Sequence, residues 1–193
     1  CACLVGSEMC IRDSIFSEKN ESVSMQIIND TSAMIPEPCV ATIGFFDGVH
    51  MGHRYLIQQV KEIAAAKGLR SALVTFPVHP RKVMNAAYHP ELLTTPEEKT
   101  NLLAGTGVDY CLMLDFTPDI SRLTAKEFMT QILKERFQVK YLVIGYDHRF
   151  GHNRSEGFDD YVRYGQAIGI EVIRAQAYTD DIQIDTCLLY TSP

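Results

Sequence analysis

The sequence predicts an α/β fold in which an open parallel sheet carries helices on both faces. Three observations predict it: the length of 193 residues suits one domain, the apolar fraction of 46% is enough for a core, and apolar strand-like runs alternate with helical patterns. Strands that alternate with helices in this way pair in parallel, because each helix returns the chain to the same end of the sheet.

Five short apolar runs predict the strands of this sheet. They cover residues 39–46, 69–76, 108–116, 140–146 and 170–175. The first run, Cys-Val-Ala-Thr-Ile-Gly-Phe-Phe, is rich in the residue types that favour strands.

Four segments between these runs predict helices. In residues 53–67 the apolar positions fall on one helical face, and Gly68 follows as a stop signal. Residues 95–98 (Thr-Pro-Glu-Glu) and 124–127 (Thr-Ala-Lys-Glu) are capping boxes, in which the Thr and Glu side chains bond each other's backbone N–H groups. Each box opens a helix, and a fourth helix is expected around residues 158–167.

The two ends of the chain differ from the rest. Residues 1–14 have neither helical nor strand period, and residues 1–14 and 186–193 resemble peptides translated from sequencing-adapter DNA. We expect residues 1–24 to be a non-native or disordered leader and residues 186–193 a non-native tail, with residues 25–185 as the domain. The alternative is that both ends are ordinary flexible termini.

Composition excludes several classes of function. The formal net charge of −6 is unfavourable for non-specific nucleic-acid binding, which needs a broad basic surface. The sequence has no window of 18 consecutive apolar residues and no signal-peptide pattern, so no membrane partner is expected. Cys39 and Cys111 lie in apolar runs and are expected to be buried thiols, which fits a cytoplasmic location.

Histidine and basic residues gather after the predicted strands. Five of six histidines follow a strand directly: His50, His53, His79, His148 and His152. The same loops hold Arg54, Arg81, Lys82, Arg149 and Arg154. In open α/β sheets these loops meet at the carboxyl ends of the strands, where ligands bind, so the placement predicts a site for phosphate-bearing ligands. The alternative is that loops are simply polar.

The loop after the first predicted strand is the most informative. Gly44 and Gly48 permit tight turns, and Gly52 lets a ligand approach a helix expected to begin near His53. Free N–H groups at that helix start, together with His50 and His53, can bond phosphate oxygens and stabilise charge in nucleotidyl transfer. A zinc site using the two histidines, and a purely structural histidine pair, are the competing interpretations.

Four motifs in order resemble the bacterial bifunctional riboflavin kinase/FMN adenylyltransferases, the prokaryotic FAD synthetases. Gly44-Phe-Phe-Asp-Gly-Val-His-Met-Gly-His53 is similar to their signature loop, a member of the His-x-Gly-His nucleotidyltransferase class with its Rossmann-like fold. Thr75-Phe-Pro-Val-His-Pro80, Leu93-Thr-Thr-Pro-Glu-Glu-Lys99 and Gly145-Tyr-Asp-His-Arg-Phe-Gly151, followed by Arg154, are similar to further family elements.

The resemblance implies transfer of AMP from ATP to FMN with Mg²⁺, giving FAD and pyrophosphate. It implies that His50 and His53 are catalytic and that no metal ligand is assigned to the protein. The implied ATP-binding residues are Gly44, Phe45, Asp47 and Gly52. The implied FMN-binding residues are Phe76, His79, Asp147, Phe150 and Arg154. From the residues alone, Phe76 and Phe150 can equally belong to the core.

The chain departs from the family pattern in three places. Val78 and His148 stand where the family usually has proline and phenylalanine. An Ile-Ser-Ser-Thr-x-x-Arg loop is expected after Asp185, where residues 186–193 stand instead, and the riboflavin kinase domain is expected to be missing. Two alternatives therefore remain: a non-catalytic flavin- or nucleotide-binding fragment, and a cytidylyltransferase or adenylyltransferase with another acceptor.

Overall fold

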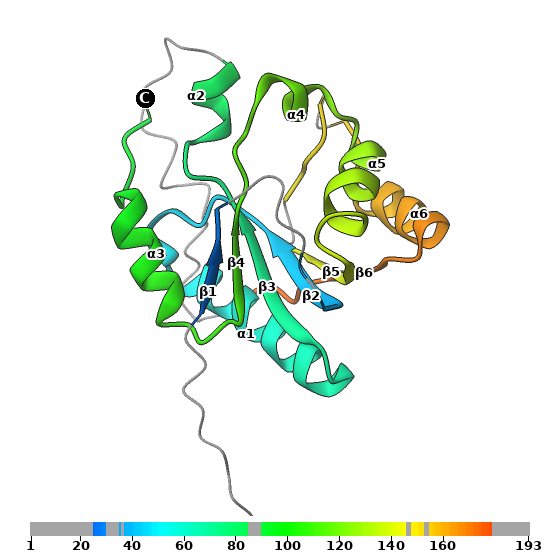
Figure 1. The fold of residues 1–193 in the computed structure, drawn as a ribbon, viewed down its shortest axis with the longest axis horizontal. Helices are drawn as coiled ribbons and strands as arrows, with labels where there is room; N and C mark the ends of the chain where they lie inside the picture. The colour runs from blue at the N-terminus through cyan, green and yellow to red at the C-terminus, as the bar shows by residue number, and fades with distance from the viewer. Residues whose placement is uncertain are drawn as a thin grey trace, which may run out of the picture.

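The protein is built around one six-stranded parallel sheet (Figure 1). The computed structural model describes residues 25–29, 35, 37–84, 90–145, 148–152 and 155–178. The strands are β1 (Gln26–Ile28), β2 (Cys39–Ile43), β3 (Arg70–Thr75), β4 (Tyr110–Met113), β5 (Val139–Ile144) and β6 (Glu171–Arg174). Their order across the sheet is β1-β4-β3-β2-β5-β6, and every neighbouring pair is parallel.

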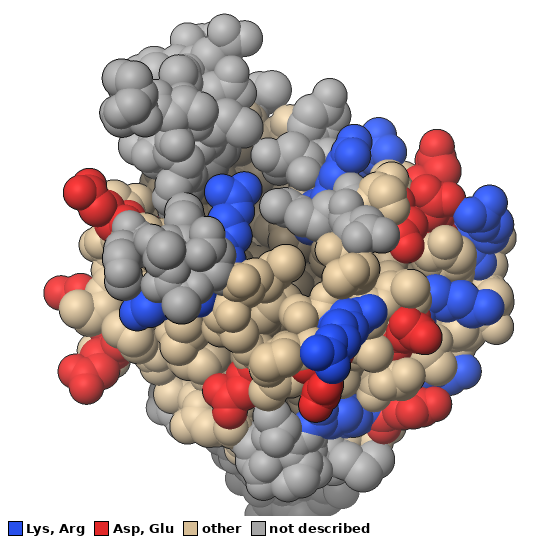
Figure 2. Space-filling model, turned by 90° about the horizontal axis from the view of Figure 1, so that it is seen from above, with Lys and Arg blue, Asp and Glu red and all other residues tan. Residues whose placement is uncertain are grey.

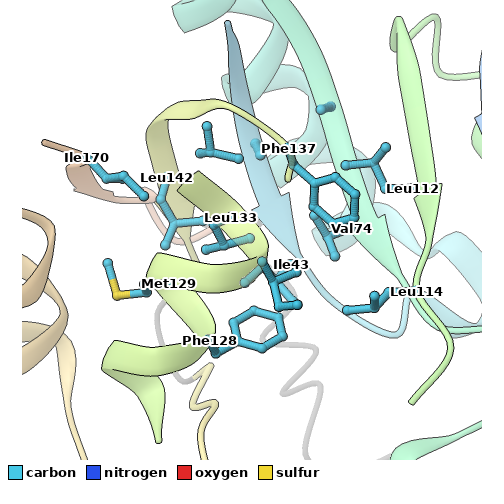
Figure 3. Packing of buried hydrophobic residues seen from close by; sticks show 14 of the residues in the cluster. Ile43, Val74, Leu112, Leu114, Phe128, Met129, Leu133, Phe137, Leu142 and Ile170 are labelled. Carbon is cyan, nitrogen blue, oxygen red and sulfur yellow. The ribbon is translucent and has the colours of Figure 1, made fainter. Parts of the chain in front are cut away.

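Helices cover both faces of this sheet, as the alternation predicts. Helices α1 (Met51–Lys67) and α3 (Pro96–Ala104) pack on one face, where Val60 of α1 meets Val40 of β2. The other face carries α5 (Ala125–Phe128), its continuation η2 (Met129–Lys134) and α6 (Phe158–Ile168). Figure 3 shows Phe128 of α5 and Leu133 of η2 beside Ile43 of β2. Successive residues of a buried strand thus enter two different cores.

The five predicted strands are present, with ends one to three residues inside several of the expected bounds. The first run ends at Ile43 rather than at residue 46, because the backbone turns at Phe46, which has a left-handed φ of 55°. Both capping boxes form as predicted. The side chain of Thr95 accepts from Glu98 N, and the side chain of Thr124 accepts from Glu127 N.

Four short elements were missed in the sequence: β1, η1 (Asp47–Val49), α2 (Pro80–Met84) and α4 (Pro118–Arg122). Each has five residues or fewer, which is too short for a period to show. The helix expected near His53 begins earlier, at Met51, and ends before Gly68 as predicted. It starts earlier because the side chain of His50 acts as its N-cap, a role more often taken by Ser, Thr, Asp or Asn.

The two cysteines in the described part of the chain are buried, as the sequence predicts. Cys39 and Cys111 are fully buried free thiols, and burial raises the pKa of Cys39 to about 12. Among the described helices, none is long and apolar enough to cross a membrane. The expected leader (residues 1–24) and tail (residues 186–193) lie outside the described residues.

Candidate functional site

The sheet has a topological switch point between β2 and β5. From β2 the chain moves through β3 to β4, and it then crosses to β5 and β6 on the other side of β2. The loops that follow β2 and β5 therefore leave adjacent strands in different directions and open a crevice at the carboxyl edge. This is the place where open α/β sheets bind ligands.

The loop after β2 is held in a tight, specific conformation. Gly44 N donates to Val74 O of β3 at 3.0 Å, which ends the strand pairing. Phe46 is then fully buried, although its φ is positive. Gly48 also has a positive φ, 67°, and a Cβ there would approach the Leu93 side chain at 3.0 Å. Any other residue at position 48 would therefore be strained in its backbone and crowded by the Leu93 side chain.

His50 and His53 lie together at the start of α1. Their rings stack with centroids 3.6 Å apart, and the ring of His53 also meets the edge of Phe46 at 5.2 Å. His53 N donates to His50 Nδ1 at 3.4 Å, which places the proton of a neutral His50 on Nε2. A Cβ at Gly52 would lie 3.3 Å from the His50 ring, so this glycine leaves room for the imidazole.

Both imidazoles are neutral at pH 7 in the ligand-free protein. Burial, and after it the charge of His50, lowers the pKa of His53 to about 3. His148 from the loop after β5 acts in the same direction, and Asp47 opposes it. Burial likewise lowers the pKa of His50. Burial disfavours the charged form of both rings, so each of them is suited to act as a neutral N–H donor.

One buried ring nitrogen in this pair lacks a partner. Among the described residues, nothing hydrogen-bonds to Nδ1 of His53. Buried polar atoms without partners are few in native proteins and need a functional or structural reason. The position marks His53 as a residue whose hydrogen bonding is incomplete before a ligand binds.

Asp47 joins this loop to the segment before α3. Its carboxylate, 3% exposed as a residue, accepts from Leu93 N at 2.9 Å and from Thr94 N at 3.0 Å. It also accepts from the Thr94 hydroxyl at 2.8 Å, and Gly48 N donates to the same hydroxyl at 3.2 Å. Asp47 was expected to line the nucleotide pocket, and the structure shows that its oxygens also fix two loops together.

Lys99 is a residue that the sequence reasoning missed as part of the site. It is 2% exposed, and its ammonium donates to Phe76 O at 2.7 Å and to Phe45 O at 3.3 Å. It also lies 4.0 Å from the centroid of the Phe45 ring. One signal was available: Lys99 and Leu103 share a helix face, so a lysine stands on the apolar side of α3.

The predicted flavin-side residues are partly dispersed. Phe76 is buried against Phe116, with ring centroids 5.6 Å apart, so its ring belongs to the core. Phe150 stacks on the buried Tyr161 at 4.3 Å. His79 lies beside the Phe45 ring at 4.8 Å, and its Nδ1 accepts from Arg81 N. The two remaining predictions, Asp147 and Arg154, lie outside the described residues.

A pocket of about 370 Å³ opens beside the ends of β5 and β6. Its lining residues are Ile144, Gly145, His148, Arg149, Gly157, Phe158 and Arg174. Arg174 lies 4.2 Å over the Phe158 ring, so one basic group and one aromatic face are already paired there. The pocket therefore offers both apolar surface and basic groups, and His148 of its lining acts on the pKa of His53.

The carboxyl edge as a whole is mixed in charge. Figure 2 is seen from the end where α2 and α4 lie, and it shows Lys and Arg side chains around the rim with Asp and Glu side chains between them. The centre of this face is formed by uncharged residues among those described. The basic residues predicted from the sequence therefore do not make a uniformly positive edge.

The described residues contain no group of three or more His, Cys, Asp or Glu side chains that could hold a metal ion. A zinc site built on His50 and His53 would need such a third ligand. The stacked arrangement of the two rings instead leaves each of them as a separate hydrogen-bonding group.

A parallel sheet with two histidines at the helix after its switch point defines an α/β fold of the His-x-Gly-His nucleotidyltransferase type. The family can be named more closely. The chain belongs to the FAD synthetase family, whose model matches residues 32–185.

Relatives with known names agree with this membership. A bifunctional riboflavin kinase/FMN adenylyltransferase of Escherichia coli (strain K12) is 35% identical over 153 residues, covering 79% of this chain and 49% of the relative. The protein of that name from Listeria monocytogenes is 36% identical over 126 residues, covering 65% and 40%. The chain thus spans about half the length of the curated relatives it matches.

A solved structure shares the fold. A crystal structure described as a macrolide-efflux protein from Streptococcus pneumoniae superposes with a TM-score of 0.70 at 28% identity. The match covers 82% of this chain and 52% of that one.

Proposed function

We propose that this chain transfers AMP from ATP to FMN, giving FAD and pyrophosphate. One observation carries the proposal: the stacked pair His50 and His53 stands at the first turn of α1, at the switch point of a sheet in an FAD synthetase family member. A helix N-terminus is a common binding site for phosphate, and the imidazole N–H groups add donors to this one.

The chemistry needs positioning and charge stabilisation more than covalent help from the protein. A phosphate oxygen of FMN attacks the α-phosphorus of ATP, the bond to the β-phosphate oxygen breaks, and pyrophosphate leaves. Negative charge grows on the phosphate oxygens during this step, and N–H donors placed in a dry site stabilise it. His50 and His53 are such donors, and a bound phosphate would raise their low pKa values by favouring the protonated form.

The two substrates are assigned to different loops at the carboxyl edge of the sheet. Gly44, Phe45, Asp47 and Gly52 of the loop after β2 would surround the nucleotide. The predicted FMN-binding residues are Phe76, His79, Asp147, Phe150 and Arg154. For Phe76 the support is weakest, because the residue is only 7% exposed.

Mg²⁺ would arrive with ATP. Mg²⁺ keeps several waters and binds through one or two carboxylates plus substrate phosphates, and no three-ligand protein cage occurs in the described part of the chain. Asp47 is a carboxylate whose charge acts on both histidines, in the direction that raises their pKa values. The ion would neutralise the phosphate charge. We place the reaction in the cytoplasm, with no nucleic-acid partner.

The test is direct. The purified chain is incubated with FMN, ATP and Mg²⁺. The flavins are separated by liquid chromatography with fluorescence detection, and pyrophosphate is measured by a coupled enzymatic assay. We expect FAD and pyrophosphate in equal amounts. Parallel reactions replace FMN by riboflavin or by a non-flavin phosphate, and replace ATP by CTP.

Two outcomes would contradict the proposal. Transfer to a non-flavin acceptor at a higher rate would assign a different adenylyltransferase or cytidylyltransferase activity. Tight FMN or ATP binding in a titration of the same sample, with no FAD formed, would assign a binding module instead.

A further inference from the structure

The segment Leu93–Lys99 touches the site from two directions although none of its residues was assigned a role in the reaction. At its start, Leu93 N and Thr94 N donate to Asp47, and the Thr94 hydroxyl bridges Asp47 and Gly48 N. At its end, Lys99 reaches the loops after β2 and β3. We call this segment the brace.

The brace is itself rigid at its centre. The capping box fixes Thr95 and Glu98 to each other: Glu98 Oε2 accepts from Thr95 N at 2.9 Å, and Thr95 Oγ1 accepts from Glu98 N at 3.2 Å. Its two contacting ends are therefore held at a constant separation by the first turn of α3.

Lys99 contacts the loops that follow β2 and β3, beyond the last paired residues of these two strands. Its ammonium donates to Phe45 O and Phe76 O, which follow β2 and β3 respectively, and Thr75 Oγ1 of β3 donates to the same Phe45 O at 3.1 Å. The loop with the proposed nucleotide contacts and the loop with His79 thus share one cation.

Packing alone does not explain a lysine here. A methionine would fill a similar space without carrying a charge into a position that is 2% exposed. Burial lowers the pKa of Lys99, while Asp47 of η1 (Asp47–Val49) and Cys111 of β4 act to raise it. The hydrogen bonds to two carbonyls and the contact with the Phe45 ring offset the cost of burying the ammonium.

We propose that Lys99 is a positioning residue, which sets the distance between the nucleotide loop and the flavin loop by holding Phe45 O and Phe76 O together. This inference rests on the proposed function for its catalytic consequence, but its structural part does not. Lys99 touches no reacting atom in this scheme and acts through the backbone of two loops.

The main test replaces Lys99 by methionine and uses Lys61→Met as the matched control. Lys61 of α1 also donates to a backbone carbonyl, Thr106 O at 2.7 Å, but this carbonyl lies beyond the other end of α3. For Lys99→Met we expect kcat to fall about 10- to 100-fold at a temperature well below melting, because small misplacements of reacting groups have effects of this size. The dissociation constants of FMN alone and ATP alone should change little. Lys61→Met should leave kcat unchanged.

A second variant covers the case in which Lys99→Met fails to fold. Thr94→Val removes the hydroxyl that bridges Asp47 and Gly48 N at the other end of the brace. We expect the same pattern with a smaller loss of kcat. If kcat stays at the wild-type value in both variants, or if kcat falls only in proportion to single-substrate affinity, the positioning role is wrong.

Hydrogen exchange separates this inference from the proposed function. In Lys99→Met, the amides of residues 44–50 and 76–79 should exchange faster together, while Lys61→Met changes neither segment. This holds even if the wild-type chain makes no FAD, an outcome that would count against the proposed function alone. Unchanged exchange in both segments would overturn the role of Lys99.

Discussion

Two carboxylates, the buried Asp47 and the partly buried Asp109, hold opposite ends of the sheet with nearly the same bonds. At the carboxyl edge, Asp47 accepts from Leu93 N, Thr94 N and the Thr94 hydroxyl. At the amino edge, Asp109 accepts from Ser71 N at 2.8 Å and the Ser71 hydroxyl at 2.6 Å, with Arg70 as an ion-pair partner at 3.2 Å.

The two carboxylates differ in what they join. Ser71 lies in β3 and Asp109 directly precedes β4, two strands that the ladder already holds together. Asp47 joins loops that no strand pairing connects, and these loops carry the candidate site. Hydrogen bonds to a carboxylate therefore reinforce the sheet at the amino edge, whereas at the carboxyl edge they fix the geometry of the candidate site.

The largest effect is expected for His53, which belongs to the histidine pair at the carboxyl edge. His53→Ala should lower kcat for FAD formation by about 10²–10³-fold, the usual consequence of removing one transition-state donor. FMN affinity, measured by quenching of flavin fluorescence, should change far less. His152→Ala is the matched control, since His152 bonds Ser121 O away from the pair. Equal losses of kcat and FMN affinity would remove His53 from its role.

The comparison itself is tested by Asp47→Ala against Asp109→Ala. Each removes a carboxylate that accepts several hydrogen bonds, so each should lower the free energy of unfolding by about 2 kcal/mol in urea titrations. FAD formation measured well below the melting temperature should fall in Asp47→Ala and persist in Asp109→Ala. If both variants keep their activity, the contrast between the edges does not hold.

The third prediction concerns the pH dependence of the free energy of unfolding, to which His53 contributes at the carboxyl edge. The folded-state pKa of His53 is lowered to about 3, so between that value and about 6.5 the unfolded chain binds more protons and stability falls as the pH falls. From pH 7 to pH 5 the wild type should lose about 1–2 kcal/mol more than His53→Gln. An identical pH dependence in the two proteins would mean that the His53 ring is solvated.

Asp109 titrates in a lower pH range. Burial raises the pKa of its carboxyl, but the hydrogen bonds from Ser71 and the charge of Arg70 together lower it below its usual value. Its contribution is therefore present above the unfolded pKa, near 4, and is lost as the pH falls through the folded value.

The smallest effect is expected for Arg70→Ala at the amino edge. The side chains of Arg70 and Glu37 are 46% and 54% exposed, and exposed ion pairs contribute about 0–1 kcal/mol. The free energy of unfolding should therefore fall by less than about 1 kcal/mol, and less still in high salt, with FAD formation unchanged. A larger loss would show that Asp109 depends on Arg70 more than on Ser71.

The sequence by itself determined the features that depend on neighbouring residues. The five strand runs, the stop at Gly68 and the capping boxes at Thr95 and Thr124 follow from periods and from bonds between residues three apart. The histidine pair was found in the same way, because His50 and His53 belong to one short motif.

Tertiary structure alone decided the features whose partners are distant along the chain. Asp47 meets Thr94 across 47 positions, and Lys99 meets Phe45 across 54, through contacts that only the parallel order of β2, β3 and β4 creates. The burial of Phe76 and the low pKa of His53 likewise depend on what packs around them. A local pattern specifies an element, but desolvation and long-range hydrogen bonds depend on how the elements are assembled.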